Sequence, residues 1–174
     1  MKELLLKATL TKKLKKNEIL SICKLKNTHW KYGISSQLNW FNEHIKQNDI
    51  HNLAYLKKKL VGYVLLRKRN FLLKKKQRKY LYYDTLIVAK KQRKQKIAHK
   101  LSSLIENVIK KSKLHSMLIC EKKIEPFHKK YKWKKINNKK SQIIDHKYPK
   151  NFSMMCLNET VTIAKNNIKY FIFS

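Results

Sequence analysis

Apolar and polar positions follow two different periods along this chain, and the period predicts the type of each element. In the first fifty residues, apolar side chains recur every three or four positions, which is typical of helices with one buried face. This pattern predicts helices over Lys15–Lys26 and Gln37–Gln47, and Ser35 or Ser36 is a plausible N-terminal cap for the second. Ahead of them, the short apolar run Leu4–Leu10 is predicted to be a strand.

After residue 50 the pattern changes to short β-prone runs separated by basic stretches. Arg67–Lys79 is predicted to be a basic connector, Gln95–Lys111 a helix, and Pro126–Tyr131 a short helix opened by its proline. The predicted strands are Asn52–Lys57, Leu60–Arg67, Tyr80–Val88, Leu114–Cys120, Trp133–Ile136, Phe152–Leu157 and Ile168–Phe173. Together these elements predict an α+β (mixed α/β) fold, in which a mixed sheet is covered by helices and residues 1–174 form a single domain.

The net charge of +33 is weaker evidence of function than its size suggests. A strongly basic chain invites a role in nucleic-acid binding. However, 39 of the 43 basic residues are lysine and only four are arginine, whereas base readout and planar phosphate contacts favour arginine. Lysine, asparagine and isoleucine have AT-rich codons, so drift in base composition explains much of the charge. Nucleic acid is therefore a possible partner but not the favoured one.

Several classes of protein are poorly supported by the sequence. The longest apolar run, Leu60–Leu66, is far shorter than the ~20 residues that a membrane-spanning helix needs. The N-terminus lacks the features of a secretory signal, and the three cysteines are widely spaced with no CxxC pair. We therefore expect a cytoplasmic protein without a membrane span, a disulfide framework or a metal site.

The segment most informative about chemistry is Leu86–Leu101, where a strand leads into a basic turn and then directly into a helix. Free N–H groups at a helix start, together with the positive end of the helix dipole, form a site for anions such as a pyrophosphate. The alternative is a solvated basic turn, which spacing alone favours.

This segment resembles the acetyl-CoA-binding motif of the GCN5-related N-acetyltransferases (GNAT), written R/Q-x-x-G-x-G/A. Arg93–Ala98 fills the frame, with Lys96 in place of a glycine, and Tyr83–Val88 matches the preceding strand. A second block, Leu118–Glu121 with Ile124–Trp133, resembles the pattern C-E-x-x-L-x-P-F-Y-x-x-x-G-F/W of the arylalkylamine and aminoglycoside N-acetyltransferase branch. In that block, His128 replaces a tyrosine and Lys132 replaces a glycine.

The resemblance implies a mostly antiparallel sheet in which the fourth and fifth strands splay apart to admit acetyl-CoA. It also implies which backbone groups bind this co-substrate. The pantetheine arm would meet Leu86, Ile87 and Val88, and the pyrophosphate would meet the amides of Arg93, Lys94, Gln95, Lys96, Ile97 and Ala98. Asp84 is the candidate base, or else it forms hydrogen bonds within the sheet. His128 is the candidate acid, or else a surface histidine.

The same resemblance places an acceptor pocket at the first two helices, so Trp30, Tyr32 and Trp40 either contact substrate or pack in the core. Cys120 is expected to be a core residue. The predicted function is acetyl-CoA-dependent, direct N-acetylation of a primary amine, with a small amine or amino sugar favoured, by a monomer or homodimer. The alternatives are a basic nucleic-acid-associated protein and a GNAT-fold protein that has lost catalysis.

Overall fold

The computed structural model describes residues 3–73, 76–136, 142–143, 151–157 and 168–172. The chain folds into two compact units. The first contains the described residues up to Arg67 together with Asp84–Ile105, and the second contains Lys68–Tyr83 together with the described residues from Glu106 on. The chain passes from one unit into the other within two strands and one helix.

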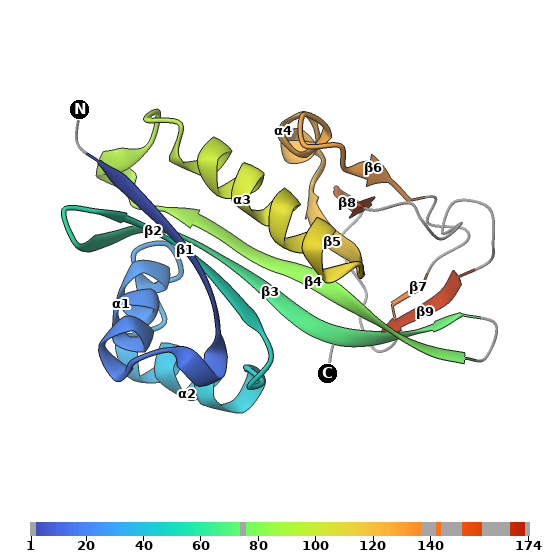
Figure 1. The fold of residues 1–174 in the computed structure, drawn as a ribbon, viewed down its shortest axis with the longest axis horizontal. Coiled ribbons are helices and arrows are strands. Elements are labelled where there is room, and N and C mark those ends of the chain that lie inside the picture. The colour runs from blue at the N-terminus through green and yellow to red at the C-terminus, as the bar shows by residue number, and fades with distance from the viewer. Residues whose placement is uncertain (1–2, 74–75, 137–141, 144–150, 158–167, 173–174) are drawn as a thin grey trace. The chain divides into compact units, whose positions relative to one another are not determined.

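The first unit is built on an antiparallel sheet of β1 (Leu4–Leu10), β2 (Ile50–Leu56) and the first part of β3 (Lys59–Leu73). Helices α1 (Lys16–Asn27) and α2 (Ile34–His44) lie on one face of this sheet, and α3 (Ile97–Ser112) begins on the other (Figure 1). The face toward α1 carries a cluster of buried side chains. Its members are Ile22, Leu25, Leu53, Leu60, Tyr63, Leu65 and Ile87.

Gly62 allows α3 to approach the opposite face of β3. A Cβ atom at this position would lie 2.9 Å from Ile97 Cγ2 and 2.9 Å from Leu101 Cδ1, which is closer than ordinary van der Waals contact. The sequence contains two glycines, and this one provides the close approach of helix and strand. It therefore helps to position the N-terminal turn of α3, where the predicted anion site lies.

The predicted start of the second helix was wrong. α2 begins at Ile34, three residues before Gln37, so Ser35 and Ser36 lie inside its first turn. The capping position is Gly33, whose φ of 87° is accessible to glycine and strained for other residues. The sequence pattern favoured serine because its hydroxyl can cap a helix, but here the backbone conformation of a glycine decides the boundary.

The basic connector predicted over Arg67–Lys79 was also wrong. β3 continues to Leu73, and β4 (Lys76–Val88) begins three residues later. Burial alternates from Arg67 to Phe71, with Arg67, Arg69 and Phe71 buried and Lys68 and Asn70 partly exposed. Burial of every second residue is typical of a strand. The sequence did not predict this strand because two of its buried residues are arginines, which are usually exposed.

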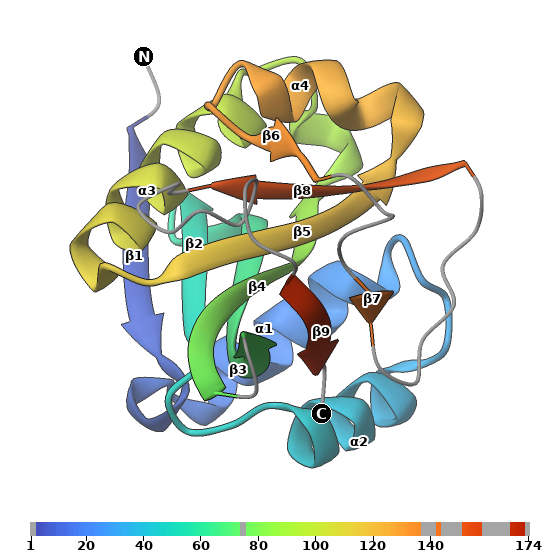
Figure 2. The ribbon, with the colours of Figure 1, turned by 90° about the vertical axis from the view of Figure 1, so that its right-hand side faces the viewer.

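The second unit contains β5 (His115–Glu121), which runs parallel to β4 and antiparallel to β8 (Phe152–Leu157; Figure 2). β6 (Lys134–Lys135) pairs with β8, β9 (Ile168–Ile172) pairs with the end of β3, and β7 (Gln142–Ile143) pairs with β9. A short helix, α4 (Glu125–Lys129), follows β5. The buried cluster of this unit consists of Phe71, Tyr80, Met117, Ile136, Met154 and Cys156.

The pairing of strands confirms the predicted mixed, mostly antiparallel sheet with helices. The hydrogen-bonded path through the described strands runs β1-β2-β3-β4-β5-β8-β6. The parallel ladder pairs Tyr80–Tyr83 of β4 with His115–Leu118 of β5, and β4 then runs on to Val88. The ladder therefore ends at the point where the fourth and fifth strands were expected to part. None of the helices described has the length and apolar composition needed to cross a membrane.

Candidate functional site

The turn after β4 leads directly into the first turn of α3, as the sequence predicted. β4 ends at Val88, a short 3-10 helix covers Lys90–Gln92, and α3 begins at Ile97. The N–H of Lys100 donates to the carbonyl of Lys96 at 3.0 Å, so the amides of the residues between them precede the helical hydrogen bonds. A cavity of about 230 Å³ lies at this helix start. Its walls are Val88, Gln92, Arg93, Lys94, Lys96, Ile97, Ala98 and His99.

Lysine has a left-handed backbone conformation at both positions where the motifs that the sequence resembles have glycine. Lys96 has a φ of 57°, and Lys132, at the second substituted glycine, has a φ of 62°. Left-handed backbone costs an ordinary L-residue about 1–2 kcal/mol. The local fold therefore keeps its shape at both positions despite the substitutions. Within the described residues, the non-glycine residues with positive φ are all lysines: Lys57, Lys58, Lys94, Lys96, Lys113 and Lys132.

The residues around this turn fit a pyrophosphate. Basic side chains and the first turn of α3 meet at one small cavity, and the Nε of Arg93 donates to the Val88 carbonyl at 3.4 Å, which holds the guanidinium at the end of the strand. The backbone N–H of Arg93 already donates to the Lys90 carbonyl at 3.3 Å. Gln95 is exposed in the same turn and is not part of the cavity wall. The Ala89 N–H donates to the Val61 carbonyl at 2.8 Å and so fixes the strand end.

A second cavity in the first unit collects most of the other predicted site residues. Its volume is about 540 Å³, and it is lined by Lys26, Trp30, Tyr32, Ser36, Gln37, Trp40, Asp84 and Thr85. The three aromatic residues predicted to contact substrate therefore share one cavity with the candidate base. Trp30 and Trp40 also pack against the buried cluster, as the core alternative predicted, whereas Tyr32 is 72% exposed. Contact of the three with substrate stays a prediction.

Asp84 is held by a neighbouring arginine. Its Oδ2 atom accepts a hydrogen bond from Nη1 of Arg67 at 3.2 Å, and both side chains are largely shielded from solvent. The hydroxyl of Thr85 lies 3.5 Å from Oδ1. These contacts fix the orientation of the carboxylate at the wall of the cavity. Its role as a base stays a prediction.

Lys26 is the residue of this cavity that the sequence analysis missed. Its side chain is only 7% exposed, and its Nζ atom lies 3.6 Å from the centroid of the Trp40 ring. Burial lowers the pKa of this ammonium group, while the negative charge of Asp84 acts in the opposite direction. A signal was present, because Lys26 follows Ile22 by four residues and so falls on the buried stripe of α1.

His128 belongs to the second unit and is buried, so the alternative that it is a surface histidine was wrong. It is 5% exposed, with its ring centroid 5.6 Å from that of Tyr83 and 6.2 Å from that of Trp133. Burial lowers its pKa to about 4, which leaves the ring neutral at pH 7. Its role in proton transfer stays a prediction.

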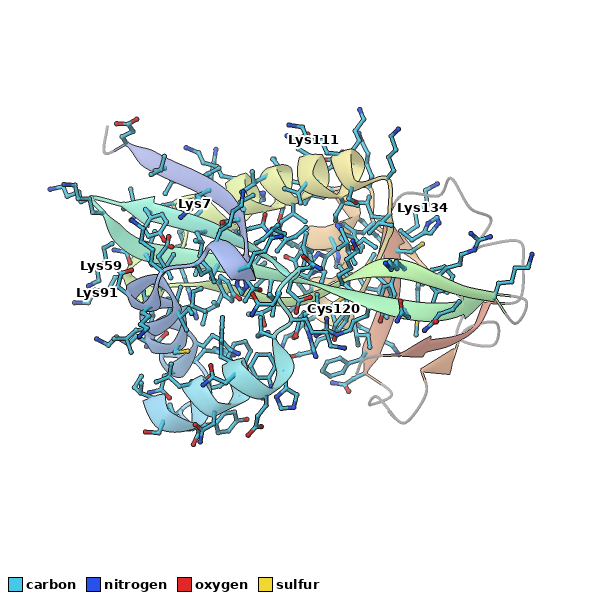
Figure 3. All side chains as sticks on the ribbon, turned by 60° about the horizontal axis from the view of Figure 1, so that its bottom comes forward. Lys7, Lys59, Lys91, Lys111, Cys120 and Lys134 are labelled. Carbon is cyan, nitrogen blue, oxygen red and sulfur yellow. The ribbon has the colours of Figure 1, made fainter. Side chains whose placement is uncertain are left out.

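Two further residues of the second block have structural partners. Cys120 (labelled in Figure 3) is buried, as predicted for a core residue, and burial raises the pKa of its thiol to about 11. Glu125 hydrogen-bonds Ser153, and this contact leads the causes that lower the pKa of its carboxyl group. In the part of the chain described, no group of three His, Cys, Asp or Glu side chains could hold a metal ion.

A third cavity of the first unit is strongly basic. It measures about 680 Å³ and lies between α1, the β2–β3 turn and the segment after β4. Lys59 and Lys91, two of its lysines, are labelled in Figure 3. No acidic residue belongs to its described wall. Its lysines are Lys24, Lys57, Lys58, Lys59, Lys90 and Lys91.

Comparisons with known proteins agree with this architecture. Residues 11–144 match the sequence profile of a family described as acetyltransferase (GNAT) domain. No curated protein matches the sequence significantly.

Several solved structures share the fold at low sequence identity. The GNAT family N-acetyltransferase YhbS from Escherichia coli, solved in complex with CoA, is 9% identical with a TM-score of 0.72, over 100% of this chain and 91% of that one. E. coli ElaA is 10% identical with a TM-score of 0.67, over 88% and 99%. An aminoglycoside 6'-N-acetyltransferase complexed with coenzyme A is 13% identical with a TM-score of 0.65, over 87% and 96%.

The matched profile covers most of the chain and includes both the turn before α3 and the block around α4. Acetyl-CoA is the co-substrate of this family, and the basic turn at the start of α3 fits its pyrophosphate. On this evidence the chain belongs to the GNAT family of acetyltransferases.

Proposed function

We propose that the chain transfers the acetyl group of acetyl-CoA directly to the primary amine of a small molecule, a class that includes amino sugars. The observation that carries this proposal is the placement of two cavities along one strand. Asp84 and Thr85 of β4 line the aromatic cavity, and Val88 of the same strand lines the basic cavity at the start of α3. Four residue steps of a strand span about 13 Å. A pantetheine arm along Leu86, Ile87 and Val88 would join the two.

The chemistry requires one proton to leave the amine and one to reach the departing sulfur. Asp84 would accept the amine proton, directly or through water, as the nitrogen lone pair attacks the thioester carbonyl. The new C–N bond forms, the C–S bond breaks, and the CoA thiolate takes up a proton. No acyl-enzyme is needed, and the raised pKa of Cys120 keeps that thiol protonated at neutral pH.

His128 is proposed to deliver the proton to sulfur as a relay. At neutral pH its ring is neutral because burial lowers its pKa to about 4. A neutral imidazole carries one N–H donor and one acceptor nitrogen. It would therefore give its N–H proton to the departing sulfur, while its second nitrogen takes up, through water, the proton that left the amine. If Asp84→Asn and His128→Ala both leave turnover intact, these two assignments fail.

Binding of acetyl-CoA is measured by calorimetry at moderate salt. A chain of net charge +33 with a lysine-lined cavity attracts any polyanion, so ATP and heparin are the controls. Saturable binding that is selective for acetyl-CoA supports the proposal, and equal binding of all three contradicts it. Arg93→Ala should weaken acetyl-CoA binding, whereas Arg78→Ala, at an exposed position of β4, should not.

Turnover separates an active enzyme from a family member that has lost catalysis. Release of the CoA thiol is followed over a panel of amines. Acetyl-CoA binding without any amine-dependent release would favour loss of catalysis. The lysine-lined cavity also keeps nucleic-acid binding as a second candidate function. That function predicts affinity for RNA or DNA that falls steeply with salt and does not change with Arg93→Ala.

A further inference from the structure

The aromatic cavity holds a buried cation that forms no salt bridge with any described carboxylate. Lys26 is 93% shielded, since its relative exposure is 7%, and it lines the cavity together with Asp84. Among the described residues, its ammonium group meets the face of Trp40 and lies within salt-bridge distance of no carboxylate. A buried charge is costly unless it is paired. The cavity therefore offers a position that an anionic group of a ligand would complete.

The carboxylate that lines the same cavity already has a cationic partner. Asp84 pairs with Arg67 at 3.2 Å, so its charge is opposed by a guanidinium group. The walls then present one cation and one carboxylate, in a cavity that is otherwise aromatic and polar. A molecule with several amino groups would find a single acidic side chain there. A molecule with one amino group and one carboxylate matches both charges.

We propose that Lys26 binds a carboxylate of the acceptor, so that the acceptor is a small amine of the amino-acid class. This inference rests on the proposed function. The acceptor amine would lie toward Asp84, where it loses its proton, and its carboxylate would receive the Lys26 ammonium. Trp30 and Trp40 would flank the side chain of the acceptor. Lys26 is thus a specificity-determining residue, while the acetyl transfer itself remains as written above.

The test compares acceptors that differ only in charge. L-phenylalanine carries the carboxylate, L-phenylalaninamide replaces it with a neutral isostere, and phenethylamine lacks it. The amide has the less basic amine, so without an anion site it would be the better acceptor. We expect kcat/KM to be about 10–100-fold higher for L-phenylalanine than for its amide, as for other charge-assisted contacts. Initial rates are measured from release of the CoA thiol at saturating acetyl-CoA.

Variants then assign this preference to one side chain. Lys26→Met keeps the length and packing of the side chain without its charge, and it should abolish the preference for L-phenylalanine over its amide. Lys26→Arg should restore much of it. Lys24→Met is the matched control, because Lys24 lies on the same helix and is exposed. Wild-type indifference to the carboxylate, or an unchanged preference in Lys26→Met, would overturn the inference while amine acetylation still upheld the proposed function.

A binding measurement decides the inference even if no tested amine is acetylated. Tryptophan fluorescence reports on the cavity through Trp30 and Trp40, and N-acetyl-L-phenylalanine and its amide serve as probes. Selective binding of the carboxylate by the wild type but not by Lys26→Met supports the inference. Equal binding of both probes overturns it. A loss of acetyl-CoA affinity in Lys26→Met would also overturn it, because Lys26 would then serve the co-substrate.

Discussion

The left-handed conformation of Lys96 leads to a prediction in which substitution by glycine stabilises the protein. Lys96 has a φ of 57° immediately before α3. That conformation costs an L-residue about 1–2 kcal/mol, whereas glycine adopts it freely but loses about 0.5–1 kcal/mol more chain entropy on folding. The difference favours glycine over alanine at position 96 by about 0.5–1 kcal/mol.

The comparison of Lys96→Gly with Lys96→Ala isolates this backbone effect. Both variants lose the lysine charge, and only the alanine keeps a Cβ atom. Free energies of unfolding are measured by urea denaturation, and thermal midpoints should differ by about 1–4 °C. The control pair is Lys91→Gly and Lys91→Ala, in the 3-10 helix of the same turn. Because Lys91 is not among the positive-φ residues, alanine should be the more stable there by about 0.5–1 kcal/mol.

Glycine is expected to be more stable than alanine at position 96 and less stable at position 91, so the comparison can contradict the proposed backbone strain. If alanine is also the more stable residue at position 96, the left-handed conformation is not a source of strain. Calorimetry on the same variants then reports on the co-substrate. Lys96→Gly should bind acetyl-CoA at least as tightly as Lys96→Ala, because the missing Cβ leaves more room beside the helix-start amides. Weaker binding by the glycine variant would show that the Cβ does not crowd the pyrophosphate.

Two further predictions concern packing and pH. Gly62→Ala should destabilise the chain by about 1–3 kcal/mol in urea denaturation, because its Cβ would lie 2.9 Å from both Ile97 and Leu101; unchanged stability would contradict this packing. Burial lowers the pKa of His128 from 6.5 to about 4, so the unfolded chain binds more protons between these values and stability is lost as pH falls from about 6.5 toward 4. His128→Phe should reduce the dependence of the unfolding free energy on pH by up to about 1.4 kcal/mol per pH unit. The control is the same substitution at the exposed His29, which should leave that dependence unchanged. Equal pH dependence in both variants would contradict a buried, neutral His128 ring.

Elements with an uninterrupted pattern could be predicted from the sequence. The strands Leu4–Leu10 and Phe152–Leu157 have the predicted bounds, and α3 begins two residues after the predicted start. Each is a run in which local propensity and burial favour the same conformation. The basic turn before Ile97 was also found from sequence, because a strand that leads directly into a helix places free amides at that point.

Elements whose boundaries depend on distant contacts could not be predicted in this way. Charge indicated a solvated connector after Arg67, yet that arginine is buried against Asp84 and the strand continues. Likewise, nothing local to His128 reveals that Tyr83 of β4 packs against its ring. The exposure of such side chains depends on residues that are distant in the sequence, and these contacts cannot be identified from a single sequence.

The sequence by itself determined the fold class, the family resemblance and the position of the basic turn before α3, because these follow from local periodicity and from motifs in a fixed order. Only the tertiary structure decided which lysines are buried and which adopt a left-handed backbone conformation. It places Lys96 in a glycine conformation and buries Lys26 beside Trp40, while many other lysines stay in solvent. Composition does not distinguish among the 39 lysines, whereas backbone angle and burial, which arise only on folding, set Lys96 and Lys26 apart from most of the other described lysines.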